Sequence, residues 1–86
     1  MKELIEVMAK ALVDGPEEVT VTENKGQYTS VFELRVAKGD VGKVIGKEGR
    51  TAQSMRIILA GASNKLRRRC VLEIVDWMRN SYGSTR

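Results

Sequence analysis

The sequence has few of the residues from which disulfides, zinc sites and many catalytic centres are built. Its 86 residues include no histidine and a single cysteine, Cys70. An internal disulfide, a zinc site of cysteine and histidine, and acid/base catalysis by histidine are therefore excluded. We expect no enzymatic activity and no bound cofactor or metal, and we interpret Cys70 as a small buried apolar side chain.

Long hydrophobic runs are also missing. No stretch approaches the roughly 20 apolar residues that cross a membrane. The opening segment Met1–Glu6 mixes charged and apolar residues, whereas a signal peptide needs an apolar core. We therefore expect a cytoplasmic protein with no membrane partner.

Acidic residues become scarce in the second part of the chain. Residues 1–37 contain four basic and seven acidic residues, whereas residues 38–69 contain nine basic and two acidic residues, a net charge of +7. The whole chain carries a net charge of +4. A basic block of this kind favours a partner rich in phosphate, although a merely solvated surface can have the same composition.

A helix and a hairpin are predicted for the first 37 residues. Apolar residues recur at helical spacing over residues 1–13, namely Leu4, Ile5, Met8, Ala11 and Leu12. We expect Asp14-Gly15-Pro16 to end this helix, with the glycine in a left-handed cap. Residues 19–22 and 28–37 alternate apolar and polar side chains, and the short polar link between them predicts an antiparallel pair of strands.

Two further helices are predicted between residues 41 and 66. Asp40 is placed to accept the free amides of a short helix over residues 41–45. A longer helix begins near Arg50 and has five residues spaced for burial: Ala52, Met55, Ile58, Leu59 and Ala62. Gly61 within it is tolerated if the helix packs closely on the sheet there.

The run Cys70–Val75 predicts a third strand. Because helices precede it, this strand should lie parallel to the one before it. The order is therefore α-β-β-α-α-β, which predicts an α+β two-layer domain over residues 1–77, with three helices covering one face of a three-stranded mixed sheet. Residues 78–86 are expected to form a polar tail. Three aromatic residues are assigned to core packing: Tyr28, Phe32 and Trp77.

Two glycines three residues apart, Gly46 and Gly49, lie between the two predicted helices and follow an aliphatic pair. Glycines permit a sharp turn and let the sugar-phosphate chain of a nucleic acid approach the main chain. The amides around Gly49 and Arg50 are expected to be unpaired donors at the positive end of the longer helix. The spacing matches neither the Walker phosphate loop nor the dinucleotide-binding fingerprint.

This segment resembles the signature of the KH domain, an aliphatic pair followed by Gly-x-x-Gly, here Val44-Ile45-Gly46-Lys47-Glu48-Gly49. The order of elements is similar to the bacterial, type II form of that domain, and a chain that is nearly all one KH domain looks like the small single-KH RNA-binding proteins of the KhpA family. The resemblance implies a loop that clamps about four nucleotides of single-stranded RNA. It also implies RNA-chaperone activity, a homodimer or a complex with a larger KH-containing protein, and a link to cell shape and the cell wall.

The predicted RNA site contains eight residues: Val44, Ile45, Gly46, Lys47, Glu48, Gly49, Arg50 and Arg56. Lys47 and Arg50 are expected to contact phosphates, whereas Arg56 either contacts a phosphate or is only a solvated side chain. One residue of the aliphatic pair should enter the core and the other should line a groove. The family usually has a branched aliphatic residue at the position of Ala52, so the groove is expected to be shallow. Residues 67–69, three arginines, either contact RNA or only stabilise a helix end.

Two other functions fit parts of the sequence. A ribosome-associated or protein-interaction module would use the same loop on structured RNA or on a protein, and co-sedimentation with ribosomal particles would reveal it. A nucleotide-handling enzyme is disfavoured because the phosphate-loop spacing and a general acid and base are missing. We interpret the chain as a non-enzymatic RNA-binding protein, an RNA chaperone or post-transcriptional regulator that acts with a partner protein.

Overall fold

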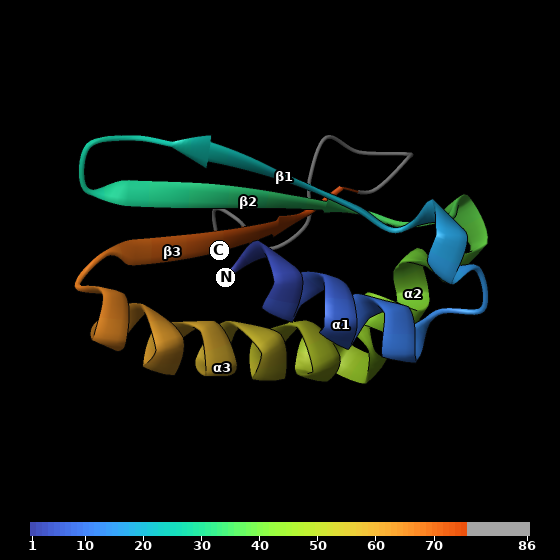
Figure 1. Ribbon diagram of the computed structural model, residues 1–86. Coiled ribbons are helices and arrows are strands. Elements are labelled where there is room, and N and C mark those ends of the chain that lie inside the picture. The colour runs from blue at the N-terminus through green and yellow to red at the C-terminus, as the bar shows by residue number, and fades with distance from the viewer. Residues whose placement is uncertain (76–86) are drawn as a thin grey trace.

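The computed structural model describes residues 1–75 and consists of two layers, a β-sheet and the helices packed against one of its faces (Figure 1). The predicted order α-β-β-α-α-β and the three-stranded mixed sheet are confirmed. The elements are α1 (Lys2–Leu12), β1 (Thr20–Lys25), β2 (Thr29–Arg35), α2 (Val41–Ile45), α3 (Arg50–Leu66) and β3 (Arg69–Ile74). The predicted role of Trp77 and the predicted tail from Met78 lie outside the described residues.

The sheet has the strand order β1-β2-β3, so β2 lies in the centre. β1 and β2 are antiparallel, with Val21 opposite Leu34. β2 and β3 are parallel, with Phe32 beside Leu72, as expected for a strand that is reached through helices. Side chains alternate between the two faces of a strand, and these four residues all belong to the buried core.

Both long helices bury a narrower strip than their apolar spacing predicts. The buried residues of α1 are Ile5 and Ala9, and those of α3 are Ala52, Met55 and Leu59. Three residues that we expected to be buried are exposed: Ala11, Leu12 and Ile58. Each lies beside the buried strip, on the flank of the helix that faces solvent. Among the described residues, no helix is both long and apolar enough to span a membrane.

The predicted caps of α1 and α2 are wrong, and one contact explains both errors. Val13 leaves α1 in an extended conformation, and Gly15 has φ −112°, which is not left-handed. The backbone N–H of Gly15 donates a 3.0 Å hydrogen bond to Oδ2 of Asp40. Asp40 makes no side-chain cap to α2 because its buried carboxylate is used here, and Lys43 Nζ lies 3.4 Å from its other oxygen.

Two further expectations about packing are also wrong. A β-carbon added at Gly61 would meet no atom within 4 Å, so close packing against the sheet does not account for this glycine. Tyr28 is 75% exposed, whereas Phe32 is buried as predicted. Tyr28 lies in the turn between β1 and β2, whose residues 26–28 are all exposed. Cys70 is partly buried, and this burial raises the pKa of its thiol.

The contact between Asp40 and Gly15 predicts an acid-sensitive fold. The Gly15 N–H holds the pKa of Asp40 below its ordinary value of 3.8, so the stabilisation is complete above that pH and is lost as the pH falls through the folded pKa. Replacing Asp40 by asparagine should lower the melting temperature at neutral pH by roughly 5 °C and flatten the decline below pH 4. Thermal melts at several pH values measure both effects.

Asp14→Asn is the matched control because Asp14 also pairs with Lys43, at 3.3 Å, but its side chain is 84% exposed. An exposed ion pair contributes little, so this variant should melt like the native protein. If Asp40→Asn and Asp14→Asn melt alike, Asp40 does not stabilise the connection between α1 and β1.

Candidate functional site

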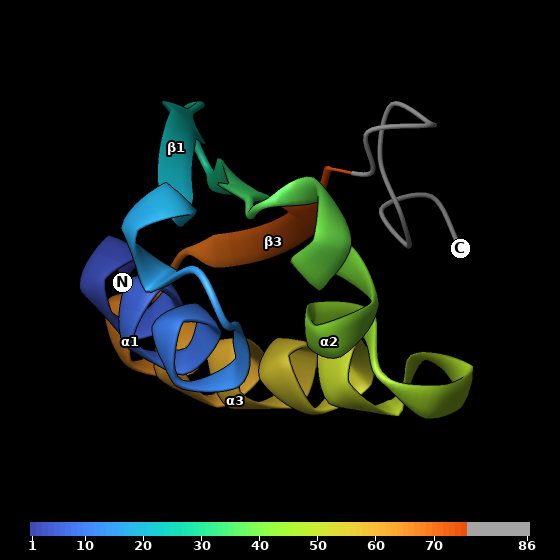
Figure 2. The same ribbon diagram turned by 90° about the vertical axis from the view of Figure 1, so that its right-hand side faces the viewer.

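The turn between α2 and α3 contains the predicted Gly-x-x-Gly loop. Figure 2 shows this turn projecting beyond the body of the domain, at the end where α3 begins. α2 ends at Ile45, as predicted, and a single 3-10 turn over Lys47–Gly49 leads directly into α3 at Arg50. The sequence therefore located both ends of the loop correctly.

Three of the four loop residues have a positive φ. Gly46 has φ 78° and ψ 173°, Glu48 has φ 57° and ψ 26°, and Gly49 has φ 75° and ψ 11°. The conformation of Gly46 belongs to a region that is essentially restricted to glycine. Glu48 is in the left-handed helical region, which costs a residue with a side chain roughly 1–2 kcal/mol. The chain therefore holds a strained glutamate at the tip of the turn.

Thr51 explains why position 46 must be glycine. A β-carbon at Gly46 would lie 2.1 Å from Oγ1 of Thr51 and 2.8 Å from its backbone nitrogen. No side chain fits in that space, so the first residue of the loop lies against the first turn of α3. Sequence reasoning missed Thr51, because its contact depends on how the turn folds back and no local pattern signals it.

The amides at the start of α3 differ from the prediction. The Gly49 N–H donates to the Gly46 carbonyl at 3.1 Å, and the Arg50 N–H donates to the Lys47 carbonyl. Both were expected to be free for a ligand. The tight 3-10 turn uses them internally, as such turns do at helix ends. An anionic ligand would therefore meet the loop's side chains and the positive end of the α3 dipole.

The charged side chains of the loop are presented in two different ways. Lys47 is exposed and has no hydrogen bond or ion pair with any residue in the part of the chain that the structure describes. Arg50 pairs with Glu48, whose Oε1 lies 3.2 Å from a guanidinium nitrogen. Both partners are largely exposed, so this pair is weak and open to competition by another anion.

The aliphatic pair divides as expected between the core and the surface. Val44 is 0% exposed, whereas Ile45 is partly buried and packs against the edge of the core. Ala52, on the other side of the loop, is also 0% exposed. Val44 and Ala52 therefore anchor the two helices that flank the loop, and only Ile45 of the aliphatic pair retains exposed surface.

Arg56 lies apart from the other predicted site residues. It is six positions beyond Arg50 on α3, about 9 Å along the helix axis. One guanidinium nitrogen donates a 3.2 Å hydrogen bond to the carbonyl of Leu72 in β3. The structure thus brings residues 44–50 together and places Arg56 between α3 and the sheet, where it joins the two layers. No group of three or more potential metal ligands occurs within residues 1–75.

Comparison with known proteins shows the family to which this loop and fold belong. The family described as KhpA/KhpB, KH domain, matches residues 2–74. The chain belongs to the KhpA/KhpB KH-domain family. No solved structure was found to match it.

Relatives from the KhpA/KhpB family match this chain over nearly the full length of the relatives. RNA-binding protein KhpA of Clostridium acetobutylicum is 48% identical over 75 residues, which are 87% of this chain and 100% of the relative. RNA-binding protein KhpA of Treponema pallidum is 49% identical over 75 residues, or 87% and 94% of the two chains. RNA-binding protein KhpA of Aquifex aeolicus is 47% identical over 76 residues, or 88% and 96%.

The element order is that of the type II KH fold, and residues 46–49 form the turn between its two middle helices. The geometry of that turn leads to a stability prediction. Gly46→Ala should lower the free energy of unfolding by about 1–3 kcal/mol, because the new β-carbon meets Thr51 and the backbone must leave a conformation reserved for glycine. Urea denaturation followed by circular dichroism measures the change.

Gly42→Ala is the matched control. Gly42 lies in α2, and a β-carbon there would meet nothing within 4 Å, so alanine should raise stability by roughly 0.5–1 kcal/mol. If both variants change stability in the same direction and by the same amount, the contact between Gly46 and Thr51 does not determine the turn.

Proposed function

We propose that this protein binds short single-stranded RNA through the loop Gly46–Gly49. The phosphates of about four nucleotides pass over the turn, Lys47 and Arg50 contact them, and Ile45 lines the adjoining groove. Glu48 pairs with Arg50, so a phosphate that contacts Arg50 must compete with the Glu48 carboxylate. Binding by this loop alone is therefore modest and has little base selectivity.

The observation that carries this proposal is the presentation of Lys47. Its side chain is exposed and unpaired among the described residues, and it belongs to a turn whose flanking helices are anchored by Val44 and Ala52. The turn leads into the positive end of the 17-residue helix α3. A free cation held at a helix N-terminus favours a phosphate, and the basic block of residues 38–69 adds long-range attraction.

The relatives support the ligand class. Those from Clostridium, Treponema and Aquifex are each named RNA-binding protein, and the present chain is about as long as they are. By extension we propose a non-enzymatic, cytoplasmic RNA chaperone or post-transcriptional regulator that needs no cofactor.

Association with a second protein is part of the proposed function. A four-nucleotide footprint is too small for tight binding unless a second site is linked to it. Two apolar side chains of α3, Ile57 and Ile58, are 63% and 48% exposed, which is unusual for isoleucine and suits a protein contact. We propose a homodimer or a complex with a larger KH-containing protein.

The loop is tested by replacing Lys47 and Glu48 together with aspartate. The change removes the free lysine and leaves two carboxylates where phosphates must pass, so RNA binding should be lost. The fold should persist with a change in stability of no more than about 0.5 kcal/mol, because both side chains are exposed and aspartate tolerates the left-handed conformation of residue 48. Fluorescence titration of a labelled unpaired RNA, beside a thermal melt, measures both.

Lys10→Asp is the control, since it makes the same change in net charge at an exposed position of α1. It should weaken binding only slightly, through the general field of the protein. Native affinity in the folded double variant, or an equal loss in Lys10→Asp, would show that RNA does not bind at the loop.

A further inference from the structure

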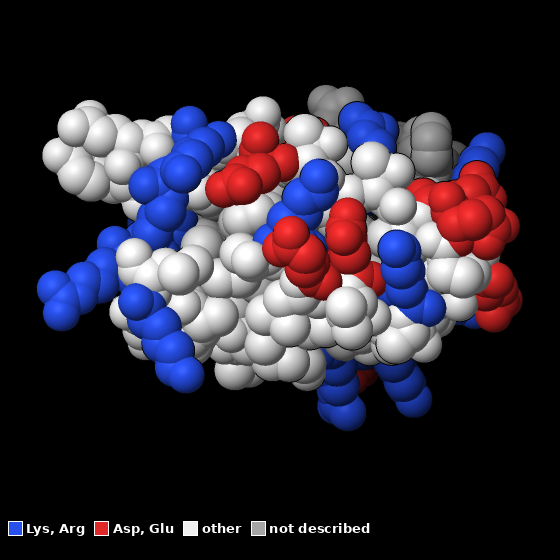
Figure 3. Space-filling view, viewed as in Figure 1, with Lys and Arg blue, Asp and Glu red and all other residues white. Residues whose placement is uncertain are grey.

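A second group of cations lies at the opposite end of α3 from the loop. The turn between α3 and β3 contains Arg67, Arg68 and Arg69, and Lys65 precedes it. Figure 3 shows Lys and Arg side chains gathered at this end of the molecule, whereas the acidic side chains lie over the middle and the other end. No acidic residue occurs between Glu48 and Glu73 in the sequence.

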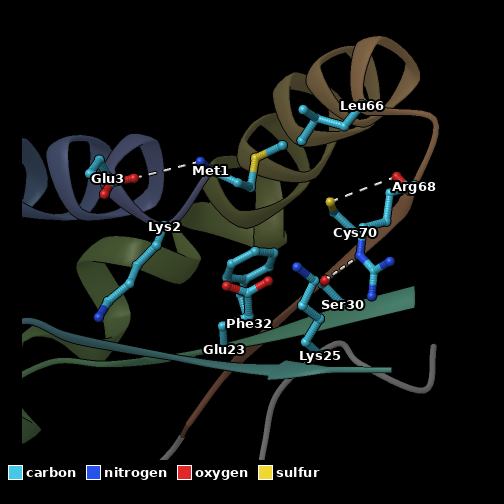
Figure 4. A pocket seen from close by; sticks show the side chains of 10 residues that line it. All are labelled: Met1, Lys2, Glu3, Glu23, Lys25, Ser30, Phe32, Leu66, Arg68 and Cys70. Atoms are coloured by element: carbon cyan, nitrogen blue, oxygen red, sulfur yellow. Dashed lines mark hydrogen bonds and ion pairs between the residues drawn. The ribbon is translucent and has the colours of Figure 1, made fainter. Parts of the chain in front are cut away.

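Within the described part of the chain, the side chain of Arg68 makes structural hydrogen bonds, unlike those of Arg67 and Arg69. Its guanidinium donates to Ser30 Oγ at 2.8 Å (Figure 4). It also donates to the Gln27 carbonyl at 3.1 Å and to the Gly26 carbonyl. These hydrogen bonds connect the turn between β1 and β2 to the start of β3. Arg67 and Arg69 therefore flank a residue whose side chain is held by several hydrogen bonds.

Arg67 and Arg69 are exposed and make no side-chain hydrogen bond or ion pair with any residue from 1 to 75. Arg67 has φ 54°, a left-handed conformation in which glycine is favoured and a long side chain is not. Its N–H, together with that of Arg68, satisfies the carbonyls of Ser63 and Asn64 at the end of α3. Two of the last four carbonyls of α3 are thus already hydrogen-bonded, which reduces the repulsion that an anion meets at this helix end.

A hollow of about 330 Å³ lies between these side chains. It is lined by Ser63, Asn64, Arg67, Arg68 and Arg69. One cation near a helix C-terminus is explained by the helix dipole alone. Two unpaired guanidinium groups and two short polar side chains around one hollow fit an anion, because arginine donates paired hydrogen bonds to phosphate oxygens.

We propose that Arg67 and Arg69 form a second phosphate-binding site that holds the same RNA strand as the Gly46–Gly49 loop. The inference rests on the proposed function of that loop. The two sites are separated by the 17 residues of α3, or about 25 Å. That distance corresponds to roughly seven nucleotides of a stacked strand, more than the four that the loop accommodates. A strand long enough to reach both sites gains affinity from the second contact.

The experiment compares an RNA of four unpaired nucleotides with one of twelve, on the native protein and on the variant Arg67→Gln/Arg69→Gln. The variant should bind the tetranucleotide as the native protein does, but its affinity for the longer RNA should fall about tenfold. The longer RNA offers several positions at which the loop can bind. Because this number is the same for the native protein and the variant, it does not affect the ratio of their affinities. The salt dependence should also become shallower by a log-log slope of about 1.4, for two lost phosphate contacts.

Two further variants keep the outcome unambiguous. Lys10→Gln/Arg35→Gln removes two exposed cations elsewhere and should retain the preference for the longer RNA. Arg67→Lys/Arg69→Lys keeps the charges and should recover most of it. The proposal is overturned if the glutamine variant binds both RNAs like the native protein, if it loses the same factor for both lengths, or if the cations removed elsewhere have the same effect. The loop is tested separately: if its aspartate variant no longer binds either RNA, the site at Gly46–Gly49 is supported even where the second site is overturned.

Discussion

Gly46 lies so close to Thr51 that no β-carbon fits between them, and the shape of the loop depends on this contact. Because the chain can turn there, α2 ends and α3 begins within four residues. Val44 and Ala52, on the two sides of the turn, stay completely buried. The loop therefore lies between two helices that are anchored in the core.

The basic residues of the second part of the chain divide by whether the fold uses them. Arg56 and Arg68 donate to backbone carbonyls and join the helices, the sheet and the hairpin turn. Lys47, Arg67 and Arg69 are presented at the two ends of α3. The net charge of residues 38–69 therefore overstates the charge available to a ligand. Because some basic residues serve the fold and others are exposed, the net charge of a segment does not distinguish a binding surface from a solvated one.

Much of the fold was predictable because its signals are local. The glycines bracket α2 and the loop, and the alternation around Phe32 marks the central strand, so these elements were predicted at the correct positions. One error arose where a residue finds its partner far away in the sequence. Asp40 has the composition of a helix cap, yet it bonds Gly15, 25 positions away. Another error was local, because the amides of Gly49 and Arg50, expected to be free, bond carbonyls within the 3-10 turn itself.

The position of the site in the sequence was predictable, but the contacts among its residues were not. Its glycines and cations could be named from the sequence, whereas the pairing of Glu48 with Arg50 and the contact of Arg56 with β3 depend on the folded chain. Which residue of the aliphatic pair is buried was also undecided, because a single helical turn shows no periodicity from which to choose.

The turn between α2 and α3 is proposed to be the surface against which unpaired RNA lies. The most direct measurement is the change in backbone amide chemical shifts when an unpaired RNA tetranucleotide is titrated into the isotope-labelled protein. The largest changes are expected at residues 46–51, in the turn and the first residues of α3, with the sheet strand β1 unaffected. Largest changes in β1 or α1, with the turn unchanged, would contradict this proposal.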